Sequence, residues 1–436
     1  MKKQMLMKLN YQVVYEMILF STFFICELSA QSPSFTWLGT LGGNSSHAYS
    51  VSADGSIVVG VSTTAQYRER AFRWMAGSME NLGTLGGDQS VATGISGDGS
   101  VIVGWSLDAN NIKHAFKWTS DNGMQDLDAG DYTQAVGVSY DGSVIVVNNG
   151  MDGFAYRLTS GGLKNIGTLG GNQSVAYDIS DDGSVIVGFS YDSSGDPYAF
   201  RWTEDSIMKI GTYYSFARGV SGDGNTVTGS ETGAAGLHRA FRWTESNGFE
   251  FNIAGNFTYG LAVSGNGDVI VGDGDGAFRL TDGGGLENLA LIYSDLLDAG
   301  SELYDAVDIS PDGLFIVGNG KNSLTGLDEG YLIAVNGITA IENLNKIPDD
   351  LGTLLNYPNP FILSTTIEIS LPKESNISLV IYNSLGEKVQ TLISNELKSA
   401  GKHKICWTPG NLASGIYLCR LETETGFKTI KMWHLK

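Results

Sequence analysis

The hydrophobic and polar positions of this chain follow a short pattern that returns many times. Ser52-Ala53-Asp54-Gly55 precedes the apolar run Ile57-Val58-Val59, and Ser96-Gly97-Asp98-Gly99 precedes Val101-Ile102-Val103. An Asp-Gly pair between two such runs predicts a β-hairpin, because glycine accepts the positive φ that a tight turn needs. A run that is apolar on both faces is expected for a strand buried between neighbouring sheets.

The pattern has a regular period, which predicts the fold. Its turn position is occupied in order by Asp54, Asp98, Asp141, Asp182, Asp223, Asn266 and Asp312, in steps of 44, 43, 41, 41, 43 and 46 residues. Two further sequence phrases also recur, Ala71-Phe72-Arg73-Trp74 and Leu38-Gly39-Thr40-Leu41-Gly42-Gly43. Each unit is therefore predicted to contain four short strands. Four strands in forty to forty-five residues is the size of a β-propeller blade. We therefore predict an all-β, seven-bladed β-propeller, in preference to a parallel β-helix or an open sandwich.

The ends of the repeat region indicate how the ring closes. Phe35 to Thr40 is an additional copy of a final-strand phrase that lies before the first complete unit, and the last unit ends weakly at Gly330 to Ile333. An N-terminal strand would complete the last blade and remove an exposed sheet edge. The segment from Ile338 to Leu344 is the alternative source of that strand.

The recurring phrases resemble the extracellular HAF repeat proteins, named for His-Ala-Phe. His114-Ala115-Phe116-Lys117-Trp118 is the intact copy, and the resemblance spans about 35 to 335. Other copies replace the histidine with Arg70, Tyr198, Arg239 or Gly276, so no chemistry that depends on the histidine is implied. The resemblance implies an extracellular propeller-like protein.

A different pattern follows residue 345. Alternating runs at 366–371, 377–382, 388–392, 403–407 and 415–421, separated by turns, predict a small immunoglobulin-like β-sandwich. Tyr357-Pro358-Asn359-Pro360-Phe361, Ile381 to Val389 and Leu412 to Tyr417 resemble the type A sorting domain of the type IX secretion system. This resemblance implies recognition of residues 355–436 by that secretion machinery and a location outside the cell or on its outer-membrane surface.

The first thirty residues predict a signal peptide. Lys2, Lys3 and Lys8 precede an apolar run of about ten residues, and Leu28-Ser29-Ala30 is a small-residue cleavage site. The run is too short to span a membrane, which needs about 20 residues. The expected division is a signal peptide at 1–30, a propeller at 31–345, a linker at 346–354 and a sorting domain at 355–436, with no membrane span in the mature protein.

The charge of the chain limits the classes of binding partner, and its cysteines limit the possible disulfides. Residues 31–345 hold 14 Lys and Arg against 37 Asp and Glu, whereas residues 346–436 hold 10 against 8. An acidic body repels phosphate backbones, so nucleic acid is excluded as a partner. Beyond the signal peptide the cysteines are Cys406 and Cys419, so disulfides do not hold the repeats together, and whether these two pair is left open.

No catalytic, metal-binding or cofactor-binding constellation is apparent in the sequence, and we predict no cofactor and no metal. His47, His114, His238 and His403 lie in different repeats or domains, without metal-ligand spacing. The turn aspartates recur wherever hairpin geometry needs them, and Asp273 to Gly276 lacks the further ligands of a calcium loop.

Residues that break the repeat in the loops leading into the innermost strands are the candidate site. They are mostly aromatic or amide residues, which suit sugar or peptide binding. The candidates are Tyr132, Gln134, Gln173, Tyr214, Phe216, Phe257, Tyr259 and Tyr304. We expect a binding or adhesion module with a glycan or protein ligand, and a secreted glycosidase-like hydrolase is the alternative.

Overall fold

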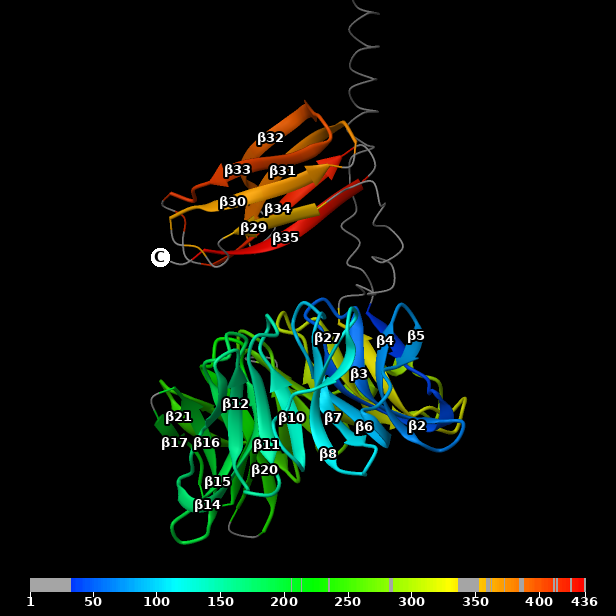
Figure 1. Ribbon diagram of the computed structural model, residues 1–436, viewed down its shortest axis with the longest axis vertical. Helices are drawn as coiled ribbons and strands as arrows, with labels where there is room; N and C mark the ends of the chain where they lie inside the picture. Colours follow the sequence, from blue (N-terminus) through cyan, green and yellow to red (C-terminus); the bar gives the residue numbers. More distant parts are fainter. Residues whose placement is uncertain are drawn as a thin grey trace, which may run out of the picture. The chain divides into compact units, whose positions relative to one another are not determined.

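The protein is described by a computed structural model that covers residues 33–204, 206–212, 214–233, 236–281, 285–335, 353–357, 361, 363–371, 373–383, 388–410, 412, 415–423 and 426–434. The chain divides into two compact units, Met1–Ala340 and Ile341–Lys436 (Figure 1). The predicted signal peptide at 1–30 lies outside the described residues. No helix among the described residues is long and apolar enough to cross a membrane.

The first unit is built from antiparallel groups of four strands that follow one another along the chain. The first three groups are β2 (Gly42–Val51), β3 (Ile57–Thr64), β4 (Glu69–Met75) and β5 (Ser78–Asn81), then β6 (Gly86–Ile95), β7 (Ile102–Asp108), β8 (Lys113–Thr119) and β9 (Gly123–Asp126), then β10 (Thr133–Val138), β11 (Ile145–Asn149), β12 (Ala155–Thr159) and β13 (Gly162–Asn165). In each group the strands pair in sequence order.

The later groups follow the same plan. They are β14 (Gly170–Ile179), β15 (Ile186–Asp192), β16 (Pro197–Thr203) and β17 (Ser206–Lys209), then β18 (Ser215–Val220), β19 (Thr226–Thr232), β20 (His238–Thr244) and β21 (Gly248–Asn256), then β22 (Tyr259–Val263), β23 (Val269–Asp273), β24 (Phe278–Thr281) and β25 (Gly285–Asn288). A short helix α2 (Leu289–Ile292) and a 3-10 turn η1 (Ser294–Leu296) then lead to β26 (Glu302–Ile309), β27 (Phe315–Lys321) and β28 (Asp328–Ala334).

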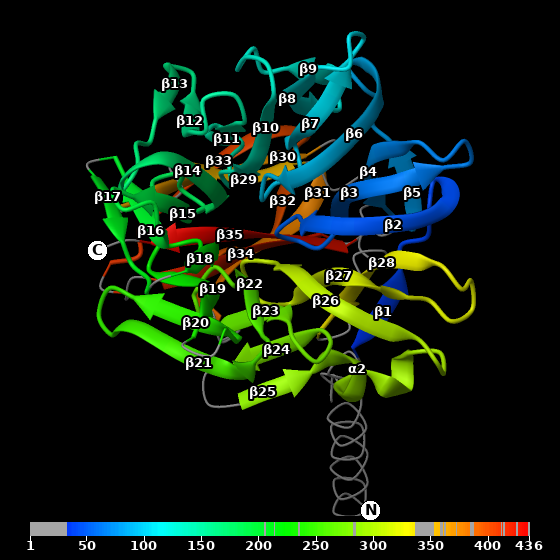
Figure 2. The same cartoon turned by 90° about the horizontal axis from the view of Figure 1, so that it is seen from below.

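The first strands of the groups line a common centre. Each of β2, β6, β10, β14, β18, β22 and β26 contacts the first strand of the next group, and β26 contacts β2. The view in Figure 2 shows the groups arranged around that centre. The described part of the unit is therefore an all-β, propeller-like ring.

The N-terminal segment completes the last group. β1 (Ser34–Trp37) pairs antiparallel with β28, with Ser34 opposite Ala334 and Trp37 opposite Tyr331. Phe35 stacks on Tyr331 at a centroid distance of 5.5 Å, which adds aromatic contact to the strand pairing. Of the two strands that the sequence left open, the one at Phe35 to Thr40 forms this edge. The alternative, Ile338 to Leu344, lies outside the described residues.

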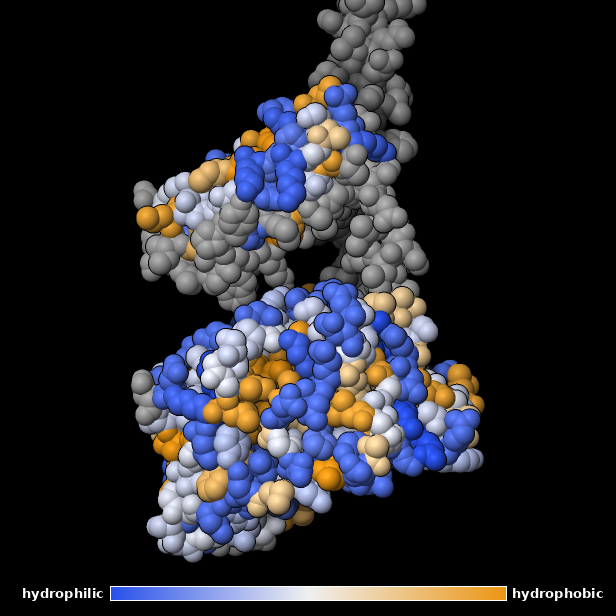
Figure 3. All heavy atoms as spheres, in the orientation of Figure 1, coloured by the Kyte–Doolittle hydropathy of each residue, from blue (hydrophilic) through white to orange (hydrophobic). Residues whose placement is uncertain are grey.

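Hydrophobic clusters lie between successive groups. One cluster joins Ile57 and Val59 of the first group to Ile95, Ile102 and Phe116 of the second. Strand residues that are apolar on both faces are buried on both, as the sequence predicts, with Val58 and Val59 fully buried. On the face shown in Figure 3, hydrophilic residues surround smaller hydrophobic patches.

The second unit is also all-β. Its strands are β29 (Thr353–Tyr357), β30 (Thr365–Leu371) and β33 (Gly401–Trp407) in one sheet, and β31 (Ser375–Asn383), β32 (Lys388–Lys398), β34 (Gly415–Thr423) and β35 (Gly426–His434) in the other. One hydrophobic cluster takes Ile367 and Trp407 from the first sheet and Ile381 and Leu421 from the second. β29 begins at Thr353, inside the segment 346–354 that the sequence predicts as a linker. Cys406 and Cys419 are both free thiols.

Candidate functional site

The Ala-Phe-Arg-Trp phrase has a structural role in every group that carries it. The N–H of Ala71 donates a 3.0 Å hydrogen bond to Ser90 Oγ at the start of the next group. The same bond joins Ala115 to Thr133, Ala155 to Ser174, Ala199 to Ser215 and Ala240 to Thr258. Phe72, Phe116, Phe200 and Phe241 are fully buried. The repeated residues therefore hold neighbouring groups together, which leaves the non-repeated residues as candidates for ligand contact.

The Ser-x-Asp-Gly phrase closes a turn in each group. Asp98 Oδ1 accepts hydrogen bonds from Ser96 Oγ at 2.6 Å and from the N–H of Ser100 at 2.9 Å. Burial acts to raise the pKa of Asp98, but these hydrogen bonds to the ionised form hold it below its usual value. Gly99 has φ +75°, as the turn requires. Within the described ranges no three His, Cys, Asp or Glu side chains are placed to hold a metal ion.

The loops that lead into the first strands fall into two classes. Long loops carry the Leu-Gly-Thr-Leu-Gly-Gly phrase or its Ile166 variant, and eight residues separate the end of the preceding strand from Ser46 of β2, Ser90 of β6 or Ser174 of β14. In the loop before β6, Thr84 Oγ1 donates to Gly87 O at 2.9 Å and the N–H of Leu85 donates to Ser106 Oγ at 2.9 Å. Gly83 and Gly86 supply positive φ values of 82° and 116°. Polar groups of these loops therefore form hydrogen bonds within the protein.

Short loops lead into β10, β18 and β22, with six residues or fewer between the end of the preceding strand and Thr133, Ser215 or Thr258, and here an aromatic residue has a positive φ. Tyr132, Tyr214 and Phe257 have φ values of 58°, 56° and 59°. Each comes directly before the Ser or Thr that accepts the N–H of the preceding group's Ala, so the three positions are equivalent. Their exposed fractions are 52 %, 43 % and 62 %. A large aromatic side chain at positive φ is a backbone outlier, and such outliers cluster at functional sites.

The other predicted residues lie on or beside the first strands. Phe216 packs edge to face on Phe189 with a centroid distance of 5.0 Å. Tyr259 lies 5.2 Å from the His238 ring. Tyr304 Oη donates to Asp328 Oδ1 at 3.1 Å. These contacts use part of each side chain within the protein.

Three of the predicted residues meet in one cavity of about 190 Å³. Tyr132, Gln134 and Gln173 line it together with Lys113, Asn148 and Asn149. Lys113 Nζ donates to Gln134 Oε1 at 2.6 Å and lies 4.3 Å from the centroid of the Trp105 ring. Burial lowers the pKa of Lys113. Tyr214, Phe216, Phe257, Tyr259 and Tyr304 do not line this cavity.

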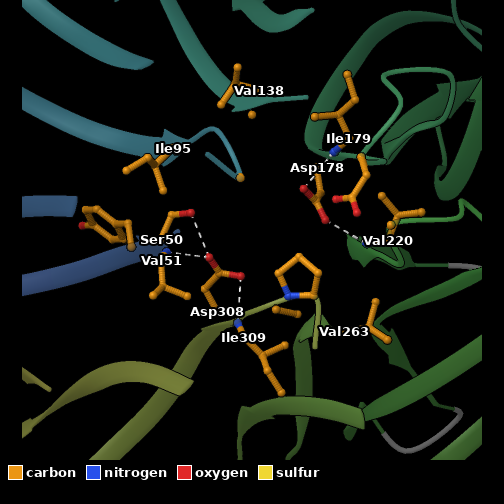
Figure 4. A pocket seen from close by; sticks show the side chains of 18 of the residues that line it. Ser50, Val51, Ile95, Val138, Asp178, Ile179, Val220, Val263, Asp308 and Ile309 are labelled. Carbon is orange, nitrogen blue, oxygen red and sulfur yellow. Dashed lines mark hydrogen bonds between the residues drawn. The ribbon is translucent and has the colours of Figure 1, made fainter. Parts of the chain in front are cut away.

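A second cavity, of about 180 Å³, lies at the other end of the first strands. It is lined by the last residue of each first strand, namely Val51, Ile95, Val138, Ile179, Val220, Val263 and Ile309. Asp178 and Asp308 lie among these apolar side chains (Figure 4). These two aspartates are not among the residues predicted from the sequence. The available signal was an Asp in Tyr177-Asp178-Ile179 where other repeats have Gly94 or Gly137.

Each of these aspartates joins two groups. Asp178 Oδ1 accepts the N–H of Ile179 and Oδ2 accepts the N–H of Val220, both at 2.8 Å. Asp308 Oδ2 accepts hydrogen bonds from Ser50 Oγ at 2.8 Å and from the N–H of Val51 at 3.0 Å. Both bonds cross the junction between the last and first groups. Burial raises the pKa of Asp178 to about 7 and that of Asp308 to about 6.

A model of the secretion system C-terminal sorting domain matches residues 356–434. This match implies export by the type IX secretion system to the cell surface or outside the cell. No curated protein matches the chain.

The fold has neighbours among solved structures. Hydrazine synthase of Kuenenia stuttgartiensis is 13 % identical, with a TM-score of 0.42 over 70 % of this chain and 98 % of that chain. The WD40 β-propeller domain of Doa1 is 14 % identical, with a TM-score of 0.42 over 68 % of this chain and 96 % of that chain. TolB from Acinetobacter baumannii is 17 % identical, with a TM-score of 0.38 over 47 % of this chain. That match spans 52 %, about half, of the TolB chain.

Proposed function

We propose that this chain is an extracellular binding protein of the HAF repeat type, with a seven-bladed β-propeller at 31–345 that binds its ligand at the end where the first strands begin. A signal peptide at 1–30 directs passage across the inner membrane. A β-sandwich at 355–436 then addresses the protein to the type IX secretion machinery, and 346–354 links the two domains.

The seven-bladed count is supported by contacts within the repeat unit. The first strands contact one another in a cycle from β2 to β26 and back to β2. Pairing of β1 with β28 gives the last group a fourth strand, so each group has the size of a blade. A closed ring leaves only short sheet edges, which protects the blades from pairing with other chains.

One observation carries the binding function. Tyr132, Tyr214 and Phe257 are exposed aromatic residues at positive φ in equivalent places of three groups. Glycine or asparagine would take this backbone with less strain. Tyr67 shows that a single exposed aromatic residue can take this backbone in an ordinary turn, but its recurrence at three equivalent positions needs a reason outside the fold, and contact with a ligand is the simplest one.

The test compares ligand capture by matched variants. The mature chain, residues 31–436, is used to probe glycan and peptide arrays as wild type and as the triple variant Tyr132→Gly, Tyr214→Gly, Phe257→Gly. The control is Tyr67→Gly, because Tyr67 also has φ 57° and is exposed but lies in the turn between β3 and β4. We expect the triple variant to lose array binding and the control to keep it. Equal binding by all three proteins contradicts the proposal.

The domain division has its own test by limited proteolysis. The first cut should fall between 346 and 352, because the residues before and after this stretch belong to separate hydrophobic clusters. A first cut inside a blade would contradict the division.

A hydrolase is the second candidate, and the raised carboxyl pKa values of Asp178 and Asp308 are the observation that favours it. Against it, both oxygens of each carboxyl group accept hydrogen bonds from the protein. An assay with soluble polysaccharides decides between them. Release of reducing ends by wild type and its loss in Asp178→Asn would establish the hydrolase.

The export function rests on the family match at 356–434. Deletion of 355–436 should leave the propeller folded in the periplasm, because the signal peptide alone carries a chain only across the inner membrane. Cell fractionation of full-length and truncated protein measures this. Normal surface display of the truncated chain would show that the address lies elsewhere.

A further inference from the structure

We propose that the cavity lined by Lys113, Tyr132, Gln134, Asn149 and Gln173 is a subsite for one neutral sugar ring of a glycan. This inference rests on the proposed binding function and names the chemical class of its ligand. The cavity lies where the second, third and fourth groups meet, because its lining comes from β8, β10, β11 and the segment at β14.

Tyr132 forms the aromatic side of this subsite. Its backbone is held in place by the N–H of Gly150, which donates to Tyr132 O at 3.0 Å. The side chain is half exposed and lines the cavity. A tyrosine ring offers an apolar face to the C–H groups of a sugar, and the fixed backbone limits the region in which the ring can lie.

Amide groups supply the polar side. The side-chain amide of Asn148 is already engaged within the protein, because its Nδ2 and Oδ1 both form hydrogen bonds to the backbone of Ala176 at 2.9 Å. Asn149 accepts the N–H of Met151 with its Oδ1. The side-chain amide of Gln173 has no hydrogen-bond partner among the described residues. Amides both donate and accept, which matches the hydroxyl groups of a sugar.

The second ligand donor is Lys113. Its Nζ carries three N–H groups, and one of them is used by Gln134 Oε1. The Trp105 ring lies on one side of the ammonium group, and Lys113 also lines the cavity. Burial lowers the pKa of Lys113, because the charged form loses hydration.

Size and charge exclude other ligands of the proposed function. A volume of about 190 Å³ is below the range of roughly 300–1,000 Å³ typical of pockets for drug-sized molecules, so one ring fits better than an oligomer. Residues 31–345 carry 37 acidic against 14 basic side chains, which disfavours a polyanionic glycan. A neutral glycan with one ring in the cavity and the rest across the exposed aromatic residues satisfies both constraints.

Trp105 provides a built-in reporter for the experiment. Because Lys113 Nζ lies 4.3 Å from its ring, a ligand that contacts Lys113 changes the surroundings of Trp105. The mature chain is titrated with neutral hexasaccharides of glucose, N-acetylglucosamine, xylose and mannose, with oligogalacturonate as the anionic arm. Tryptophan fluorescence is compared in wild type and Trp105→Phe.

Three variants test the subsite. We expect Tyr132→Gly to raise Kd about tenfold and Gln173→Ala about fivefold, and Tyr67→Gly to stay within about twofold of wild type. Circular dichroism and melting temperature of each variant show whether it is folded. A fluorescence change that disappears in Trp105→Phe, together with these Kd values, supports the subsite.

The outcomes separate this inference from the proposed function. If glycan binding is lost in Tyr214→Gly and Phe257→Gly but unchanged in Tyr132→Gly and Gln173→Ala, the subsite is wrong and the binding function stands. Binding of oligogalacturonate alone, or of peptides alone on the arrays, also overturns the subsite. If no hexasaccharide binds and no array signal depends on the aromatic residues, both proposals fail.

Discussion

The first strand of each group has two ends, and both need residues at positive φ. At the end with the Ser-x-Asp-Gly turns, glycine takes this conformation in every group, at Gly55, Gly99, Gly142, Gly183, Gly224, Gly267 and Gly313. At the end where the strand begins, glycine takes it in the long loops, whereas the short loops also place Tyr132, Tyr214 and Phe257 at positive φ. Glycine alone thus serves at the turn end, and aromatic residues share this role at the other end.

The difference shows what constrains each end. A Cβ atom at Gly99 would lie 2.8 Å from Ile57 Cδ1 of the preceding group, so the turn end is constrained from inside the protein. At the other end, 62 % of Phe257 is exposed, so its side chain is not tightly packed inside the protein. The turn end is therefore shaped by packing between groups, whereas Phe257 at the other end is not held by such packing.

The variant with the largest expected effect disrupts the Ser-x-Asp-Gly turn of the second group. Asp98→Ala with Gly99→Val removes the hydrogen bonds from Ser96 and Ser100 and places a β-branched residue at φ +75°, against Ile57. We expect a loss of about 3 kcal/mol in the free energy of unfolding. Urea denaturation measures it.

Gly123→Val is the matched control for this change. Gly123 has φ +66° but no atom within 4 Å of an added Cβ, so only backbone strain remains, about 1 kcal/mol. Equal losses in the two variants would show that packing between groups does not constrain the turn end.

The second expected effect is a pH dependence of the free energy of unfolding, caused by aspartates at the turn end. The folded-state pKa of Asp178 is raised from 3.8 to about 7, so the neutral form is favoured on folding. Its contribution to stability is complete below pH 3.8 and is lost as pH rises through about 7. Asp308 acts in the same direction, with a pKa of about 6.

We expect the free energy of unfolding to fall by about 2 kcal/mol between about pH 5 and pH 8.5. Solvent reaches part of each residue, which keeps this figure below the full linkage value. Asp178→Asn should flatten the dependence, and the exposed Asp88→Asn should leave it unchanged. A wild-type protein that is more stable at pH 8.5 contradicts the raised pKa values.

The third effect tests a feature that both loop classes share. Ser90 follows a long loop and Ser215 a short one, and each Oγ accepts the N–H of an Ala in the preceding group at 3.0 Å. Ser90→Ala and Ser215→Ala should each lower the free energy of unfolding by about 1.5 kcal/mol, because a buried N–H loses its acceptor. Thermal unfolding of the two variants measures this. A much larger loss in one of them would mean that the loop classes differ in stability and not only in their exposed residues.

Sequence reasoning predicted the features that repeat. The four-strand units follow from phrases whose turn glycines and alternating apolar residues have local causes, and Phe35 to Thr40 identified the closing strand as one of two options. The cavity around Tyr132 was reached in part, because Gln134 and Gln173 break the repeat in neighbouring groups. Lys113 was missed because it lies beside the His-Ala-Phe-Lys-Trp phrase and joins the cavity only through contact between groups. Asp178 and Asp308 were missed for the same reason.

The smallest effect tests whether the aromatic residues strain the backbone. Phe257→Gly should raise the free energy of unfolding by about 0.5 kcal/mol, because relief at φ +59° exceeds the gain in unfolded-state entropy. Phe257→Ala loses the same ring but keeps a Cβ atom at positive φ, so this strain should make it about 1 kcal/mol less stable than Phe257→Gly. At Gly83, φ +82° with open space around an added Cβ, Gly83→Ala should be destabilising by a similar amount. If Phe257→Ala is as stable as Phe257→Gly, the aromatic residue is unstrained, and the argument that a ligand keeps it there loses its basis.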